Sequence, residues 1–477
     1  MSSKIIKSTV VYTILGFLPL SFAFFFTPIY LKYLSPKEYG VLNLFNIYSG
    51  ILAYVYTLGV SPAFGFLYWD YYKNKEELNK FIASTIGIIL ILQTIIFVLG
   101  LIFGEQILHF ILKSNETFSF YPFGVLTLIY PISVVFYDFF SYYNRNEENI
   151  KNYVYLSVST LVFLTIGSII GLVVLELKAE GAIWGRTIGY SIIVLSYLFY
   201  FIYKVGISFN KNTSSILLKF GFPLMLSTII GGISFSMDRI LVERFFSLEE
   251  LGIYGLAIVI VSLIEVWFNA LNNALSPTIY KYMVDDIEKN NSKIRTLSHT
   301  IVIAVLFTIV ILIFISKPII EFIAPKDYYG ALKYVPILSI AFIVRVFSTL
   351  KSYIFYLHKK TKIFPMIQTI ILFLIVIFGY ILSNIMGIIG IVYAVLSVKI
   401  LELIIVTIIA NKVYFFSFKF NRMYILSLMC LVSVLIICNY ENDNNFYYSI
   451  PLLTFLIFAP IVAFKELKDI YITIVKK

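Results

Sequence analysis

Long apolar runs separated by short polar segments make up almost all of this chain. A helix needs about 20 mostly apolar residues to cross a bilayer, and about fourteen such runs occur. The longest polar stretch, about Tyr282–Arg295, is predicted to be a loop, so no sizeable soluble domain is expected. The pattern predicts an all-α polytopic membrane protein with spans at roughly 9–31, 41–68, 81–103, 119–142, 153–175, 180–203, 216–238, 251–275, 297–316, 334–356, 363–383, 386–410, 422–440 and 446–464.

The composition supports a membrane location. Of the 477 residues, 60% are hydrophobic and 13% are charged, whereas a soluble domain carries about 25% charged residues. A water-soluble surface cannot be built from so few charged residues. This balance therefore excludes a cytosolic enzyme, a secreted disulfide scaffold and a disordered protein.

Basic residues outnumber acidic ones, 37 against 26. About 25 of them fall in segments on the same side of the predicted membrane as the N-terminus, and about 9 fall on the other side. Because Lys and Arg collect in cytoplasmic loops, we predict that both termini are cytoplasmic. The basic excess is thus explained by topology, and no nucleic-acid partner is expected.

A weak internal repeat relates the two halves of the chain. Leu34–Gly40, between the first two spans, matches Phe246–Gly252, between the seventh and eighth, at an offset of 212 residues. In each segment a serine is followed three residues later by a glutamate, which is the capping-box pattern of a helix start. We predict a parallel repeat of two six-helix lobes around a central cavity, at 1–210 and 211–415, with two additional helices and a cytoplasmic tail in 416–477.

No motif for catalysis, metal binding or nucleotide binding is found in the sequence. The three histidines, His109, His299 and His358, are far apart, and no His/Cys/Asp/Glu cluster has metal-ligand spacing. No Gly-x-x-x-x-Gly-Lys-Ser/Thr loop occurs. We therefore expect a carrier rather than an enzyme, with no catalytic residues, no metal and no cofactor.

Charged side chains inside predicted spans are costly in lipid and indicate a polar cavity or a charge partner. Four of them are cationic and suit an anionic cargo, since Arg binds phosphate by two parallel hydrogen bonds and Lys binds it as a point charge. The predicted substrate-binding cations are Arg345, Lys399, Arg186 and Arg239. The acidic candidates for proton or sodium coupling are Glu265, Asp138 and Glu402.

Several of these charges have a structural alternative. Lys399 and Glu402 are three residues apart on one predicted helix and can pair with each other. Arg239, with its neighbour Asp238, can lie at the membrane interface, and Arg186 can extend to the headgroups. Arg345 is too deep to reach the surface, so a cavity with an anionic ligand or an acid such as Glu265 is expected around it.

The chain resembles the polysaccharide-biosynthesis flippases, the translocases of O-antigen and capsule repeat units within the multidrug/oligosaccharidyl-lipid/polysaccharide exporter superfamily. The resemblance extends over essentially the whole chain and rests on degenerate motifs in a fixed order. These motifs are Tyr33–Gly40, Leu218–Leu224, Met237–Arg239, Gly252–Gly255 and Gly387–Gly390.

This resemblance implies alternating access and an undecaprenyl-diphosphate-linked oligosaccharide as cargo, moved from the cytoplasmic to the outer leaflet of a bacterial inner membrane. It also implies contact with membrane lipids, and with the polysaccharide polymerase and chain-length machinery as partners. On that view Arg345, Lys399 and Arg186 attract the diphosphate. An ion-coupled drug or metabolite antiporter of the same superfamily, using Asp138 and Glu265, is the alternative. A membrane enzyme would need a large outer loop, and no predicted outer loop exceeds about 20 residues.

Overall fold

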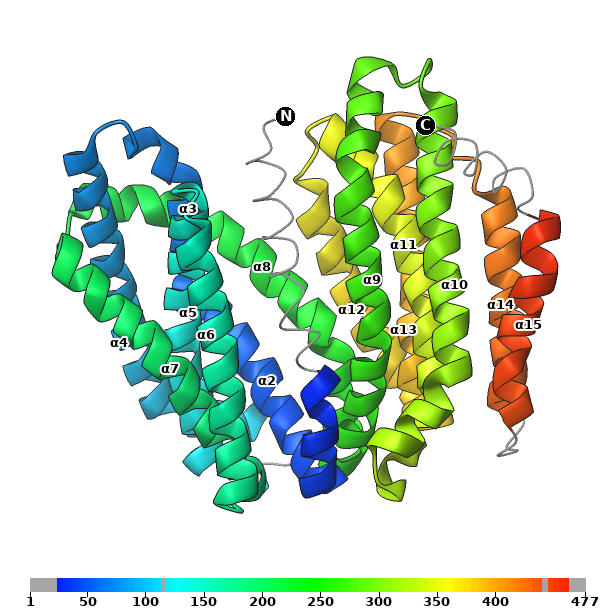
Figure 1. The fold of residues 1–477 in the computed structure, drawn as a ribbon, viewed down its shortest axis with the longest axis horizontal. Helices are drawn as coiled ribbons and strands as arrows, with labels where there is room; N and C mark the ends of the chain where they lie inside the picture. Colours follow the sequence, from blue (N-terminus) through cyan, green and yellow to red (C-terminus); the bar gives the residue numbers. More distant parts are fainter. Residues whose placement is uncertain (1–23, 113–116, 440–444, 463–477) are drawn as a thin grey trace. The chain divides into compact units, whose positions relative to one another are not determined.

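The computed structural model describes residues 24–112, 117–439 and 445–462. Within these ranges every regular element is a helix (Figure 1). Ten of these described helices are long and apolar enough to cross a membrane, or eleven if one bent pair forms a single span. The predicted all-α polytopic class is therefore confirmed.

The helices follow the predicted spans closely. Residues 24–33 are helical and lie in the first predicted span, whose other residues are outside the described part of the chain. The helices that follow are α2 (Pro36–Thr57), α3 (Val60–Tyr71), α4 (Lys75–Ile111), α5 (Val125–Asn146), α6 (Ile150–Ile169), α7 (Lys178–Val205), α8 (Lys211–Phe245), α9 (Leu248–Asp286), α10 (Asn291–Ile323), α11 (Val335–Leu357), α12 (Ile363–Met386), α13 (Ile388–Val413), α14 (Asn421–Asn439) and α15 (Asn445–Val462), with short irregular helices at Phe120–Gly124, Ile170–Val174 and Lys326–Lys333.

The structure bends one predicted span and contradicts one predicted loop. The second predicted span, 41–68, is two helices, α2 and α3, bent by 42°. The bend occurs at Leu58 and Gly59, which both have positive φ, and a Cβ on Gly59 would overlap the backbone of Gly221. The predicted loop at Tyr282–Arg295 is mostly helical, because α9 and α10 continue beyond their apolar segments and leave only residues 287–290 between them. Hydropathy marks the part of a helix that lies in lipid, and polar residues extend the same helix into water.

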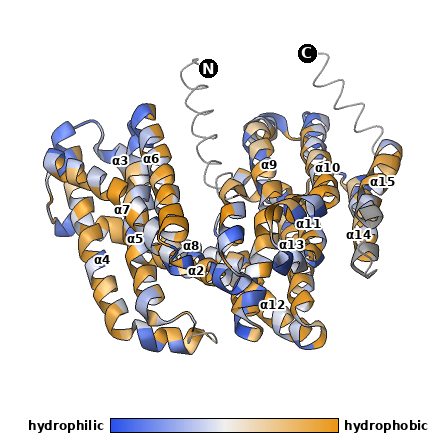
Figure 2. Cartoon of the chain, turned by 60° about the horizontal axis from the view of Figure 1, so that its bottom comes forward, coloured by the Kyte–Doolittle hydropathy of each residue, from blue (hydrophilic) through white to orange (hydrophobic). Residues whose placement is uncertain are grey.

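The chain forms two compact units. Of the described residues, unit 1 contains Lys32–Ser236 and Val242–Gly252, and unit 2 contains residues 24–31, Met237–Leu241 and the chain from Ile253. In each unit the long helices have many exposed apolar side chains. Hydrophilic residues gather at helix ends such as those of α9 and α10 (Figure 2). Less than a third of the apolar segment of α4 is buried within the protein. Such faces are tolerated when lipid covers them.

Helices α6 and α7 of unit 1 pack through glycines. A Cβ on Gly167 would overlap the carbonyl of Gly185, and a Cβ on Gly185 would overlap the carbonyl of Gly167. Gly171 and Gly181 contact each other in the same reciprocal way. Small residues allow this close backbone approach, which is a main source of helix association in membranes.

We expect Gly185→Ala to lower the apparent melting temperature of the purified protein, although alanine favours a helix by about 1 kcal/mol over glycine. The added methyl must separate two backbones, and overpacking of this kind costs about 1–3 kcal/mol. Gly50→Ala is the matched control, because a Cβ at Gly50 meets no atom within 4 Å. Equal melting temperatures for the two variants would contradict the tight packing of α6 on α7.

The repeated segments have the predicted capping geometry and also contact each other within unit 1. Glu38 Oε2 accepts hydrogen bonds from the backbone N–H and the hydroxyl of Ser35, at 2.8 and 2.9 Å. In the second copy the backbone N–H of Glu250 donates to Ser247 Oγ at 3.2 Å. A Cβ on Gly40 would overlap the carbonyl of Leu248, and a Cβ on Gly252, 212 positions later, would overlap the carbonyl of Pro36. These contacts are reciprocal because Leu248 is itself 212 positions after Pro36.

Candidate functional site

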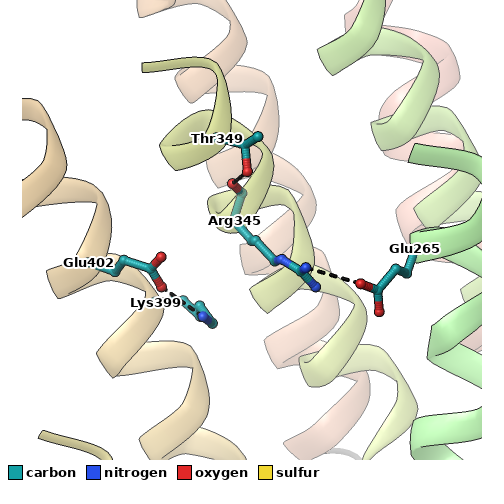
Figure 3. A network of polar contacts seen from close by, with 5 residues as sticks. All are labelled: Glu265, Arg345, Thr349, Lys399 and Glu402. Carbon is teal, nitrogen blue, oxygen red and sulfur yellow. Dashed lines mark hydrogen bonds and ion pairs between the residues drawn. The ribbon is translucent and has the colours of Figure 1, made fainter. Parts of the chain in front are cut away.

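The deepest predicted cation, Arg345, forms an ion pair inside unit 2. Its side chain extends from α11 toward α9, where Nη2 lies 3.0 Å from Glu265 Oε1 (Figure 3). The guanidinium also lies over the ring of Phe342, 5.3 Å from its centroid. The two charged side chains are 32% and 19% exposed. The pair is thus held by its neighbours and remains accessible to a ligand.

A cavity whose wall residues mostly carry hydrogen-bonding side chains, here called the polar cavity, lies along the same two helices. Its volume is about 650 Å³, within the range of pockets that bind small molecules. On α9 the hydrogen-bonding residues of its wall follow Glu265 by seven, eleven and fifteen positions, and on α11 they begin four positions after Arg345. The cavity is lined by Asn272, Ser276, Tyr280, Val284, Thr349, Ser352, Tyr353, Tyr356, Leu357 and Lys359.

Three aromatic residues and an asparagine shape this cavity. The buried Tyr353 donates a hydrogen bond from its hydroxyl to Asn272 Oδ1. The ring of Tyr280 packs on Tyr353, with centroids 4.7 Å apart, and meets Tyr356 edge-on at 6.2 Å. These contacts connect α9 to α11 and fix the orientation of the polar groups before any ligand binds.

Lys399 and Glu402 form the local pair that their spacing allowed. Lys399 Nζ lies 2.7 Å from Glu402 Oε2, and both residues are on α13. Arg345 points away from this pair, toward Glu265 (Figure 3). Glu402 is the more buried member, with 11% of its side chain exposed. The geometry therefore favours a structural role for this pair over direct contact with cargo.

We expect Lys399→Met alone to lower the free energy of unfolding by about 1–3 kcal/mol, because it leaves a largely buried carboxylate without its partner. The double variant Lys399→Met with Glu402→Leu should recover most of that loss, since removing both charges leaves no unpaired group. Thermal unfolding of the purified variants and a transport assay test this. Loss of transport in a stable double variant would show instead that the pair contacts the cargo.

Asp238 and Arg239, near the C-terminal part of α8, lie within the packing of unit 2. Asp238 is buried, and its Oδ2 accepts a hydrogen bond of 2.8 Å from the hydroxyl of the fully buried Tyr254. Arg239 Nε lies 3.5 Å from Asp238 Oδ1. Both residues belong to unit 2, where Asp238 connects α8 to Tyr254 of α9. A buried carboxylate thus holds Arg239 in the packing of the unit.

The remaining two predicted residues lie in unit 1. Arg186 donates from Nη1 to Asn46 Oδ1 at 2.6 Å, and its guanidinium lies over Tyr130 at 5.3 Å from the ring centroid. Asp138, on α5, is exposed and accepts no hydrogen bond from the described part of the chain. Arg186 therefore contacts neutral groups at these two positions, whereas each of the three other predicted cations lies beside a carboxylate.

The structure adds the cavity to what sequence patterns indicated. The asparagines that follow Glu265 are visible in the sequence as polar residues within an apolar run, whereas nothing in the sequence distinguishes Tyr280, Tyr353 and Tyr356 from the other tyrosines of the chain. The residues of the cavity wall share a regular spacing, because those of α9 recur on one face of that helix and those of α11 recur on one face of theirs. Which face of α9 meets which face of α11 is a property of the packing and is not visible in one segment.

The family model described as "Polysaccharide biosynthesis protein" matches residues 5–283. The chain belongs to this family. Thus the family that its motifs indicated is confirmed. A search of the curated proteins finds no match.

Solved structures similar to this polysaccharide biosynthesis family member share its fold. An inward-facing multidrug resistance MATE family transporter of the MOP superfamily has a TM-score of 0.70 at 15% identity, over 82% of this chain and 93% of that chain. The lipid II flippase MurJ, in an inward closed conformation, has a TM-score of 0.69 at 19% identity, over 96% and 100%. A MOP superfamily transporter from Pyrococcus furiosus has a TM-score of 0.59 at 14% identity, over 85% and 95%. At these identities the likeness establishes the fold alone.

Proposed function

We propose that this protein is a flippase that moves an undecaprenyl-diphosphate-linked oligosaccharide repeat unit from the cytoplasmic to the outer leaflet, for a surface polysaccharide such as O-antigen, capsule or exopolysaccharide. The observation that carries the proposal is the partly exposed Arg345–Glu265 pair, which lies one to two helical turns along α11 and α9 from the nearest residues of the cavity wall. In a polysaccharide biosynthesis family member, an accessible arginine beside a polar cavity suits a ligand that has both phosphate and sugar groups.

Arg345 is the proposed diphosphate-binding residue, and Glu265 is its partner in the empty state. A phosphate can accept two parallel hydrogen bonds from a guanidinium, so the diphosphate displaces the carboxylate of Glu265 from Arg345. When the cargo leaves, Glu265 pairs with Arg345 again. This exchange avoids leaving a bare cation at membrane depth in either state.

The other charges have distinct proposed roles. Arg186, whose observed contacts include neutral Asn46 and Tyr130, supplies a second cation for the diphosphate. Lys399 and Arg239 each lie beside a carboxylate. They contribute to the positive electrostatic potential of the cavity without contacting the diphosphate directly. Glu265 and the exposed Asp138 are the proposed groups for proton or sodium coupling, and Glu402 remains with Lys399.

The proposed setting is a bacterial inner membrane with both termini in the cytoplasm, as the Lys/Arg bias predicts. The functional division follows the sequence repeat, with lobes at 1–210 and 211–415 and an additional helix pair in 416–477. Alternating access requires no catalytic residue or cofactor, so no enzymatic activity is proposed. A polysaccharide polymerase and its chain-length machinery would consume the flipped repeat unit.

The test is a deletion strain of the source organism. We expect lipid-linked glycans to accumulate on the cytoplasmic leaflet while surface polysaccharide disappears, with both effects reversed by the intact gene. Mass analysis of the accumulated lipid would then identify the cargo. Normal lipid intermediates and surface glycan, combined with changed sensitivity to cationic drugs, would overturn the proposal in favour of the antiporter.

A further inference from the structure

We propose that the cavity between α9 and α11 binds the uncharged sugar residues next to the diphosphate and thereby selects the glycan. This inference rests on the proposed function, because it assigns the sugar part of the same lipid-linked cargo. The cavity has three properties that bear on its ligand: the chemistry of its wall, the fixed orientation of its polar groups, and its register with Arg345.

The wall of the cavity suits a neutral ligand with many hydroxyl groups. Eight of its ten residues carry hydrogen-bonding side chains, and none of the ten is Asp or Glu. Seven of the eight are Asn, Ser, Thr or Tyr, which both donate and accept hydrogen bonds. The eighth, Lys359, follows the end of α11. A cationic drug would favour a wall with a carboxylate, whereas sugar hydroxyls need the mixed donors and acceptors that are present.

The polar groups are oriented in advance. Because the hydroxyl of buried Tyr353 donates to Asn272 Oδ1, the Asn272 amide is held in one orientation. Tyr280 is half-buried and packs against Tyr353 and Tyr356, so its ring is held as well. A rigid aromatic ring next to a fixed amide offers an apolar surface for the C–H face of a sugar and hydrogen bonds for its edge.

The cavity begins one to two helical turns beyond the proposed phosphate site on the same two helices. Thr349 follows Arg345 by one helical turn, about 6 Å along the axis, and its Oγ1 donates to the Arg345 carbonyl at 3.0 Å. Asn272 follows Glu265 by two turns on α9. A sugar esterified to a diphosphate begins one bond beyond the phosphate oxygen. With the diphosphate on Arg345, the first sugar therefore reaches the Thr349 and Asn272 end, and later sugars extend toward Tyr280 and Lys359.

The experiment uses the purified full-length protein and two soluble probes, measured by calorimetry. The first probe is the reducing oligosaccharide released by mild acid from the lipid-linked pool of the deletion strain. The second is inorganic pyrophosphate. We expect Tyr280→Ala and Asn272→Ala each to weaken oligosaccharide binding at least tenfold and to change pyrophosphate binding less than twofold. Arg345→Ala should weaken pyrophosphate binding at least tenfold and change oligosaccharide binding less than twofold.

Matched controls separate binding from folding. Tyr203→Ala removes a tyrosine that is 92% exposed near the end of α7, and Asn384→Ala removes an exposed asparagine of α12. Both should bind the oligosaccharide as the wild type does. Tyr280→Phe keeps the ring and should remain within about threefold of the wild type, so it also shows whether loss in the alanine variant reflects misfolding.

The outcomes distinguish this inference from the function on which it rests. Pyrophosphate binding without oligosaccharide binding in the wild type, or oligosaccharide binding that the cavity variants leave unchanged, overturns the sugar site and leaves the flippase proposal standing. A cationic drug that binds in the cavity and is insensitive to the oligosaccharide also overturns it. If lipid-linked glycans fail to accumulate in the deletion strain, the flippase proposal fails, and the sugar site fails with it.

Discussion

Arg345→Ala will reduce export of surface glycan at least a hundredfold, while the protein still inserts and accumulates in the membrane. The variant removes two hydrogen bonds to the diphosphate, and each bond to a charged group contributes about 1.5–3 kcal/mol. Two such bonds at the lower value correspond to more than a hundredfold in affinity. The measurement is surface polysaccharide per cell, normalised to the amount of the variant in purified membranes.

Two further variants make this prediction specific. Arg345→Lys keeps the positive charge but loses the planar pair of donors, so it should recover only part of the export. Arg422→Ala, at an exposed position near the start of α14, should export normally. Normal export by Arg345→Ala would remove this residue from the site, and Arg186 would become the principal candidate for the diphosphate.

Glu265→Gln should have the second largest effect on export. Unlike Arg345→Ala, it should strengthen the binding of pyrophosphate. Without the carboxylate, the diphosphate no longer competes with a negative charge 3.0 Å from Arg345. Because the pair is mostly buried, its contribution exceeds that of exposed pairs, and we expect pyrophosphate to bind the purified variant about tenfold more tightly. Export should fall, because the diphosphate is no longer displaced when the cargo must leave.

The control for this variant is Glu249→Gln, which changes an exposed glutamate in the first turn of α9. It should alter neither pyrophosphate affinity nor export. If Glu265 also carries the coupling proton, export by Glu265→Gln should no longer respond when the proton gradient is collapsed. Unchanged pyrophosphate affinity in Glu265→Gln would refute the exchange of partners at Arg345.

Features that depend on neighbouring residues were predictable from the sequence. The helices follow the apolar runs because crossing a bilayer requires about 20 apolar residues in one stretch. The Ser35–Glu38 capping box and the Lys399–Glu402 pair form between residues three positions apart. Their geometry is set by one turn of one helix, so a pattern in the sequence is enough to predict them.

The helix ends and the bend between α2 and α3 were harder to predict from the sequence. Charged residues end an apolar run without ending the helix, which is why α9 and α10 extend into the predicted loop. At the bend, the backbone of Gly221, more than 160 positions away, leaves no room for a Cβ on Gly59. A local pattern contains no information about such a contact.

The sequence by itself therefore determined the class of protein, the positions of its spans and the charged residues that lie within those spans. Only the tertiary structure decided which of those charges meet. Arg345 and Glu265 are 80 positions apart, and Tyr353 and Asn272 are 81 apart. Whether such residues touch depends on how each helix is rotated about its axis, and that rotation is set by packing across the whole unit. For this reason the polar cavity of α9 and α11 emerged from the fold, although each residue that lines it was visible in the sequence.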